Sequence, residues 1–255
     1  MAPPGPRTLG DGDAPGAGDV PPLLLALETS TRIASVALLR GEELIAEETG
    51  RPDRTAAESL LPAVDAVLRK GGAEVSRLDA LAVSIGPGSF TGLRVGLATA
   101  KGLAFGSARP VIPVPTLAAL ACTAPRCDLP VVSLLDARRG EVYAGGFDLT
   151  GELPRTTVPE GVYTPAELIA RLPGRCVLVG EGVALCGAEI CAALGTGVLA
   201  VVSDPAARHV GRLGARMLAR GESVAPAVAV PRYVRRAEAE VKRTGQRFES
   251  APKRG

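Results

Sequence analysis

Short apolar runs alternate with polar turns over residues 23–48. They read as an apolar strand, a polar turn, a second strand, an Arg-Gly turn and a third strand. Runs of this length between turn residues predict a three-stranded meander. Apolar positions then recur at helical spacing and end at Gly71-Gly72, which predicts a helix. A strand over residues 78–85, a glycine-rich turn and a second helix complete this half of the chain.

The second half of the chain repeats the same order of elements. Residues 130–157 again predict a meander whose first strand ends in an acid, so that Asp136 corresponds to Glu28. The elements expected after it are a helix around residues 164–172, a strand over 176–182, a helix over 183–194 and an amphipathic helix over 204–220. Two such units of about 100 residues indicate a duplication.

The duplicated pattern predicts an α/β fold of two lobes, each with a mixed sheet flanked by helices. This is the actin, hexokinase and Hsp70-like (RNase H-like, or ASKHA) architecture, with a cleft between the lobes. We expect a disordered extension over residues 1–22, an N-terminal lobe over 23–126, a C-terminal lobe over 127–230 and a basic tail over 231–255. The first 22 residues do not resemble a signal peptide, and no apolar run approaches the ~18 residues of a membrane span. We therefore expect a cytoplasmic protein without a membrane segment.

The amino-acid composition limits the kinds of catalytic and metal sites that the chain can form. The 255 residues carry a net charge of +2, seven aromatic side chains, no Trp and a single histidine, His209. One histidine excludes zinc motifs that need a histidine pair. The five cysteines lie among apolar residues, so we expect reduced, buried thiols, no metal site and no bound cofactor. They are Cys122, Cys127, Cys176, Cys186 and Cys191.

Two hairpin turns bear on nucleotide binding. ATPases of this fold carry an acid-x-Gly pattern there, because a residue without a side chain lets backbone amides close on phosphates. Here the first turn reads Glu28-Thr29-Ser30 and the second Asp136-Ala137-Arg138. The Arg138 side chain would obstruct the phosphate path or contact an anion, and the Gly180-Glu181-Gly182 segment could cover an adenine. The candidate nucleotide or anion contacts are Thr29, Ser30, Arg138, Gly180 and Gly182, and no catalytic residue is expected.

The most distinctive segment is the glycine-rich turn and helix over residues 86–106. Its start fits either a phosphate cradle or a tight strand-to-helix turn, with Ser89 or Thr91 as the N-cap. Small residues recur every four positions along one stripe: Gly92, Gly96, Ala100 and Ala104. Two glycines cost a helix about 2 kcal/mol relative to alanine, and close approach of another backbone is the usual compensation. That neighbour belongs either to this chain or to a partner.

Six segments together resemble the TsaB (YeaZ) family. They are LLALETSTRIASVALL, ESLLPAVDAVL, LAVSIGPGSFTGLRVGLATAKGLA, PVPTLAALA, DARRGEVYAG and PRYVR, and they cover nearly all of residues 23–236. The resemblance implies the duplicated fold and a non-catalytic scaffold role. The partner implied is TsaD, which transfers threonylcarbamoyl to the adenosine next to the anticodon of ANN-decoding tRNAs. The ATPase TsaE, tRNA contacts through the complex, and a homodimer of the free chain are further implied partners.

The resemblance also implies an interface. In the family, the helices after the first meander and after the GPGSFTG turn pair with their counterparts on TsaD in a heterodimer. The residues expected at this contact are Leu60, Val64, Gly92, Leu93, Gly96, Ala100 and Ala104. Two rival functions stay open, a small-molecule kinase or ATPase of the actin-hexokinase class and a glycopeptidase-like hydrolase with Ser84 or Ser89 as nucleophile.

Three polar features have competing interpretations. Many relatives carry a histidine ahead of the ESLLP-like segment, whereas here Thr55 and Glu58 predict a capping box. The stripe Arg208, Arg212, Arg216 and Arg220 is either a solvated face or a site for an anionic partner. From residue 231 onward the net charge is +5, which fits contact with RNA or a partner, or solubility alone. Its cations include Arg232, Arg235, Arg236, Lys242, Arg243 and Arg247.

Overall fold

The first sheet contains the predicted meander extended by two parallel strands. The computed structural model describes residues 20–125 and 127–234. Its first sheet has the order β3-β2-β1-β4-β5. The strands are β1 (Leu23–Glu28), β2 (Ser35–Arg40), β3 (Glu43–Thr49), β4 (Ala80–Ser84) and β5 (Val111–Val114). The strands β1, β2 and β3 pair antiparallel, with Leu25 opposite Leu38, while β4 and β5 continue the sheet in parallel.

The second sheet repeats the first. Its order is β10-β9-β6-β7-β8; read from the other edge, β8-β7-β6-β9-β10, it is the order of the first sheet with each strand replaced by its counterpart. The strands are β6 (Val131–Asp136), β7 (Val142–Asp148), β8 (Arg155–Tyr163), β9 (Cys176–Val179) and β10 (Val198–Val201). This confirms the duplicated actin, hexokinase and Hsp70-like architecture. The four-residue edge strands β5 and β10 were not predicted individually.

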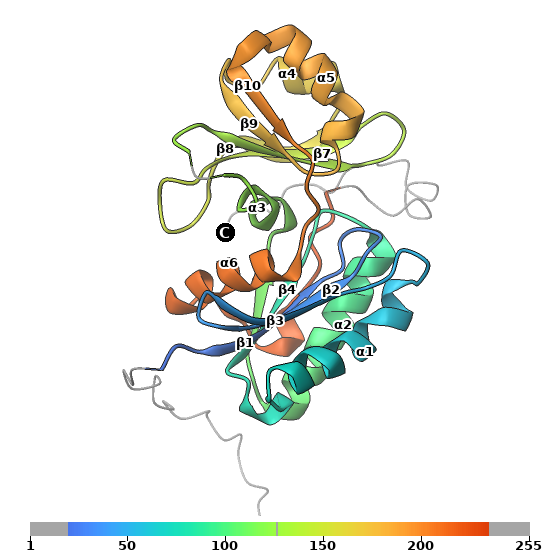
Figure 1. Cartoon of the computed structure of the whole chain (residues 1–255), viewed down its shortest axis with the longest axis vertical. Helices are drawn as coiled ribbons and strands as arrows, with labels where there is room; N and C mark the ends of the chain where they lie inside the picture. Colours follow the sequence, from blue (N-terminus) through green and yellow to red (C-terminus); the bar gives the residue numbers. More distant parts are fainter. Residues whose placement is uncertain (1–19, 126, 235–255) are drawn as a thin grey trace, which may run out of the picture.

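Helices cover both outer faces and fill the space between the sheets (Figure 1). On the outside, α1 (Ala56–Lys70) and α2 (Phe90–Ser107) pack on the first sheet, and α4 (Pro165–Ile169) and α5 (Val183–Leu194) on the second. Between the sheets lie α3 (Thr116–Ala121) and α6 (Ala207–Ala219), whose apolar side chains join one shared core. Three short 3-10 turns, η1 (Val75–Arg77), η2 (Gly195–Gly197) and η3 (Pro226–Val228), complete the described elements.

The two inner helices cross between the repeats. The helix α6 follows the second repeat in sequence but lies on the first sheet, so close that a Cβ on Gly211 would fall 2.2 Å from Leu39 Cδ1. In the other direction, α3 reaches the second sheet, where the Ser133 hydroxyl donates to the Leu117 carbonyl oxygen at 2.7 Å. Residues 127–230 are therefore one repeat in sequence but do not form one self-contained lobe.

The chain then returns over the first lobe. Val224 forms a β-bridge with Val111, and the Lys101 ammonium donates to the carbonyl oxygens of Ala227 and Ala229 at 3.1 Å. The Arg232 amide donates to the Ile85 carbonyl oxygen at 2.7 Å. The basic tail predicted from residue 231 is thus bound to the first lobe through its opening residues.

Some sequence predictions concern residues outside the described range. These are the N-terminal extension up to residue 19 and the cations of the tail beyond residue 234, namely Arg235, Arg236, Lys242, Arg243 and Arg247. Among the helices of residues 20–125 and 127–234, none has the length and apolar character to cross a membrane.

Candidate functional site

The first hairpin turn is closed by the start of α2. The Ser89 amide donates to the Ser30 carbonyl oxygen at 2.6 Å. A Cβ on Gly92 would lie 2.1 Å from the Thr29 carbonyl oxygen, and one on Gly96 would lie 2.1 Å from Thr29 Oγ1. Only glycine fits these positions, so the close neighbour that compensates for the helix glycines is the β1–β2 turn of the same chain.

This contact gives the small-residue stripe a neighbour within the chain. The stripe lies along one face of α2, and that face points into the chain's own core. All seven residues expected at the partner contact are buried in this chain: Leu60, Val64, Gly92, Leu93, Gly96, Ala100 and Ala104. A partner contact at these residues stays a prediction from sequence.

The same closure corrects the nucleotide contacts predicted in the first lobe. Thr29 and Ser30 are 0% and 2% exposed, so their hydroxyls do not face solvent. Glu28 beside them is fully buried, and its carboxylate accepts a hydrogen bond from the Ser30 amide. Within the described part of the chain, Glu28 Oε2, Thr29 Oγ1 and Ser30 Oγ find no hydrogen-bond partner. Burial raises the pKa of the Glu28 carboxyl, and hydrogen bonds from Ser30 oppose that shift.

The second hairpin turn is occupied by its own side chains. Arg138 has φ of +66°, the left-handed conformation that favours glycine. Its amide donates to Asp136 Oδ1 at 2.6 Å, and its guanidinium pairs with Asp136 Oδ2 at 3.0 Å. Nearby, Gly180 and Gly182 are buried against Leu134, where a Cβ would lie 2.1 Å from the Leu134 carbonyl oxygen at Gly180 and 2.9 Å from Leu134 carbon atoms at Gly182. Arg138 is therefore the one exposed member of the five predicted nucleotide contacts, and the five do not line a common open site.

The single histidine is a packing residue. His209 lies in α6 between the sheets, and burial lowers its pKa to about 4, with the Arg208 and Arg212 charges acting in the same direction. A neutral ring with this pKa is a poor general base or acid near pH 7. Among the described residues, no group of three or more His, Cys, Asp or Glu side chains is arranged to hold a metal ion.

The thiols follow the prediction in part. All five cysteines are free. Cys176 and Cys186 are buried, and burial raises the pKa of each thiol to about 11. Cys127 is exposed and Cys122 and Cys191 are half-buried, contrary to the expectation that all five are buried.

The arginine stripe of α6 binds acids of the same chain. Arg208 pairs with Glu47 in β3, and Arg216 pairs with Glu42 at 2.6 Å. Arg220 approaches Glu152 of the β7–β8 loop at 3.5 Å, and the Arg212 guanidinium donates to the Glu42 carbonyl oxygen. These contacts join the stripe to acids of the same chain, while the Arg208 and Arg220 side chains stay 42% and 55% exposed.

Apolar side chains are exposed on the outer side of α1 and α2, as they are at Leu185 of α5 and Leu199 of β10. Leu61 is 58% exposed on α1 and Phe105 is 84% exposed on α2. Small exposed residues recur every four positions beside Phe105: Ala98, Gly102 and Gly106. A Cβ on Gly102 or Gly106 would meet no atom within 4 Å. We call these five residues the outer helix face.

Sequence reasoning missed this face although a signal was present. The helix carries two four-residue repeats of small residues, and about 200° of helix rotation separates Gly96 from Ala98. Only the first repeat was singled out. The start of α1, by contrast, matches its prediction, because the Thr55 hydroxyl accepts from the Glu58 amide and the Glu58 carboxylate accepts from the Thr55 amide.

Comparison with known proteins identifies the family. A family model described as TsaD, tRNA N6-adenosine threonylcarbamoyltransferase, matches residues 51–248. The Escherichia coli tRNA threonylcarbamoyladenosine biosynthesis protein TsaB is 35% identical over 224 residues, which cover 83% of this chain and 94% of that protein. The chain belongs to the TsaB (YeaZ) family. TsaB of Haemophilus influenzae is 48% identical over 123 residues, and the match spans 47% of this chain and about half, 51%, of that relative.

Solved structures of the family agree with the fold. YeaZ from Pseudomonas aeruginosa superposes with a TM-score of 0.71 at 33% identity, covering 82% of this chain and 100% of that one. A second Pseudomonas aeruginosa structure, described as similar to peptidase YEAZ, has a TM-score of 0.73 at 32% identity and covers 84% of this chain and 100% of that one. The duplicated architecture is thus shared along nearly the full length of these TsaB (YeaZ) proteins.

Proposed function

We propose that this chain is a non-catalytic subunit in the biosynthesis of threonylcarbamoyladenosine in tRNA, and that it binds and activates a TsaD-type transferase through the outer helix face. Its TsaB relatives are named as tRNA threonylcarbamoyladenosine biosynthesis proteins, which supports a role for this chain in that process. The observation that carries the binding proposal is the exposed apolar face of α1 and α2, with Leu61, Ala98, Gly102, Phe105 and Gly106. In this proposal the heterodimer with the transferase forms through exposed residues of α1 and α2, and not through the seven buried residues that the sequence predicted at the contact.

The chemistry of this face suits a helix partner. The axes of packed helices lie about 8–10 Å apart, and small residues at the contact allow the shorter distances. Gly102 and Gly106 leave that space open, while Phe105 and Leu61 supply apolar area to bury. Burial of a Phe side chain is worth about 2 kcal/mol relative to exposure, so Phe105 would contribute strongly to the contact.

We infer the partner from the similarity between this chain and the transferase family. The model for the transferase family matches residues 51–248, a range that includes α1 and α2. A transferase of that family would offer a similar pair of helices, and two such pairs can pack as a four-helix arrangement. TsaE and tRNA would then meet this chain as parts of the assembled complex, and a second copy would compete for the same face when the transferase is absent.

The contacts of the two hairpin turns and of Ser84 and Ser89 support a non-catalytic role. The β1–β2 turn is covered by α2, and the Asp136 carboxylate of the second turn is engaged by Arg138. Both serines considered as nucleophiles hold backbone groups instead. Ser84 Oγ accepts from the Thr29 amide at 3.3 Å, and Ser89 Oγ caps α2 by accepting from the Gly92 amide at 3.2 Å.

The binding proposal is tested by titrating the purified chain with its cognate TsaD-type transferase. We expect Phe105→Glu and Gly102→Leu each to weaken binding at least tenfold, because a charge or a bulky side chain would enter the helix contact. Leu185→Glu is the matched control, since Leu185 is 57% exposed on α5 and lies outside the proposed face. If the α2 variants bind like the wild type, the interface proposal is wrong.

A further inference from the structure

The segment over residues 229–234 crosses the junction between the lobes and ends on α2. Its backbone is bound to the first lobe, where the Arg232 amide donates to the Ile85 carbonyl oxygen at 2.7 Å. The contact is close, because a Cβ on Gly86 would lie 2.4 Å from the Arg232 carbonyl oxygen. Two bonds from Lys101 of α2 to the carbonyls of Ala227 and Ala229 fix the approach. We call residues 229–234 the strap.

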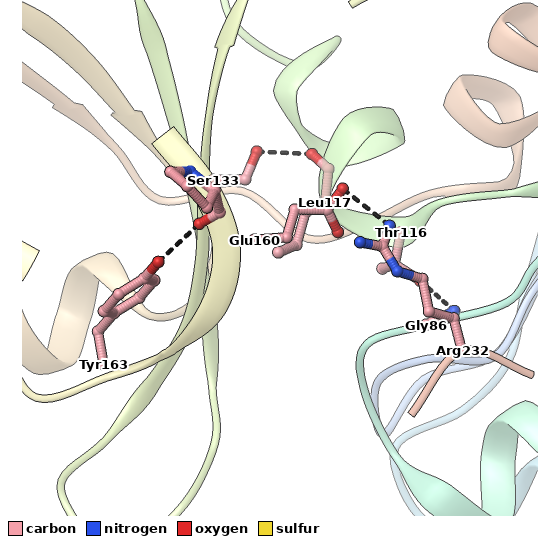
Figure 2. Close-up of polar contacts among 8 residues, drawn as sticks. Gly86, Thr116, Leu117, Ser133, Glu160, Tyr163 and Arg232 are labelled. Carbon is pink, nitrogen blue, oxygen red and sulfur yellow. Dashed lines mark hydrogen bonds and ion pairs between the residues drawn. The ribbon is translucent and has the colours of Figure 1, made fainter. Parts of the chain in front are cut away.

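One side chain of the strap reaches the second lobe. The Arg232 guanidinium pairs with Glu160 Oε1 at 3.0 Å, and Figure 2 shows this contact beside Gly86 and Thr116 at the junction. Glu160 lies on β8 with only 7% of its side chain exposed. Its second oxygen, Oε2, has no partner among the described residues. A buried carboxylate that depends on one cation is strongly destabilised when that cation is removed.

The next side chain of the strap binds the first turn of α2. The Tyr233 ring lies 4.9 Å from the ring of Phe90, centroid to centroid, and its hydroxyl accepts a hydrogen bond from Arg94 Nε at 2.9 Å. The Arg94 guanidinium stacks 3.9 Å above the Phe90 ring. Phe90 and Arg94 belong to the GPGSFTGLR segment, so two separate motifs of the sequence meet here.

We infer that Arg232 and Tyr233 are positioning residues, through which the junction between the lobes holds the first turn of α2 in the orientation that presents the outer helix face. The part of this inference that concerns partner binding rests on the proposed function. A second link between α6 and the second lobe is the ion pair of Arg220 with Glu152 at 3.5 Å, in which Glu152 belongs to the β7–β8 loop and neither residue belongs to the strap. The two links can therefore be separated by mutation.

The first readout uses the free chain and does not depend on any partner. Amide hydrogen exchange is measured over residues 90–94 in the wild type, Arg232→Met and Arg220→Met. Exchange reports local opening of a helix end. We expect Arg232→Met to speed exchange in this turn about tenfold, and Arg220→Met, the matched control, to leave it unchanged. Unchanged exchange in folded Arg232→Met overturns the inference.

A second set of variants covers the case in which Arg232→Met does not fold. Arg232→Met combined with Glu160→Gln removes the ion pair without leaving a buried charge, and it should show the same faster exchange. Tyr233→Phe removes only the hydroxyl contact with Arg94 and should give a smaller increase. The charge-swapped pair Arg232→Glu with Glu160→Arg should restore slow exchange, which a merely packing role for Arg232 would not predict.

The second readout is affinity for the TsaD-type transferase. We expect the Arg232→Met and Glu160→Gln double variant to bind about fivefold more weakly than wild type, and Arg220→Met to bind normally. If the wild type does not bind the transferase while exchange responds as expected, the proposed function fails and the strap inference stands. If the wild type binds and exchange over residues 90–94 does not respond, the strap inference fails alone.

Discussion

At the scale of single residues, the acid that opens the first hairpin turn, Glu28, lies in the core and not at the surface. In an ATPase of this fold the equivalent turn faces phosphates. Here Glu28 is fully buried, its turn is covered by glycines of α2, and three side-chain oxygens of Glu28, Thr29 and Ser30 have no partner among the described residues. Buried polar groups without partners reduce stability, so this turn lowers the free energy of unfolding of the chain.

The titration of Glu28 gives a prediction with a definite sign. Its folded pKa is raised above the ordinary value of 4.5. The folded state therefore binds the proton more tightly than the unfolded state, and stability falls as pH rises above about 4.5. We expect Glu28→Gln to be more stable than the wild type at pH 8 and equal to it near pH 4, by urea unfolding monitored at both pH values. A variant that is less stable at pH 8 would contradict the account.

At the scale of elements, sequence patterns predicted what is local and missed what is long-range. The meanders, the α1 capping box and the order of elements follow from nearby residues and were predicted. The position of α6 on the first sheet depends on contacts such as Gly211 with Leu39, far apart in sequence. The orientation of α2 was ambiguous because small or apolar residues occur all around it. Periodicity shows which residues share a face, but it does not show which face meets the core.

Two glycines of α2 test that orientation. Gly92→Ala places a methyl group 2.1 Å from the Thr29 backbone carbonyl oxygen, whereas Gly102→Ala places one in open space. We expect Gly92→Ala to destabilise the chain by about 2 kcal/mol, because overpacking exceeds the gain in helix propensity. Gly102→Ala should stabilise it by about 0.5–1 kcal/mol. Thermal unfolding of the two variants measures both, and a stabilising Gly92→Ala would reverse the assigned faces.

At the scale of the whole molecule, α2 covers the first hairpin turn, the lobes are joined on two sides, and apolar side chains of α1 and α2 are exposed on the outer side. The arginines of α6 link the lobes near the β7–β8 loop, and the strap links them near α2. The sequence predicted two lobes with a cleft, but neither link, because each joins residues from different repeats.

We propose that the outer helix face binds the transferase, and hydrogen exchange of the chain with and without a saturating TsaD-type transferase locates the contact. A contact at this face slows exchange over residues 57–65 of α1 and 98–106 of α2 and leaves α5, over residues 183–194, unchanged. Protection confined to α5 or to the second sheet, or no protection in a complex that does form, would contradict it.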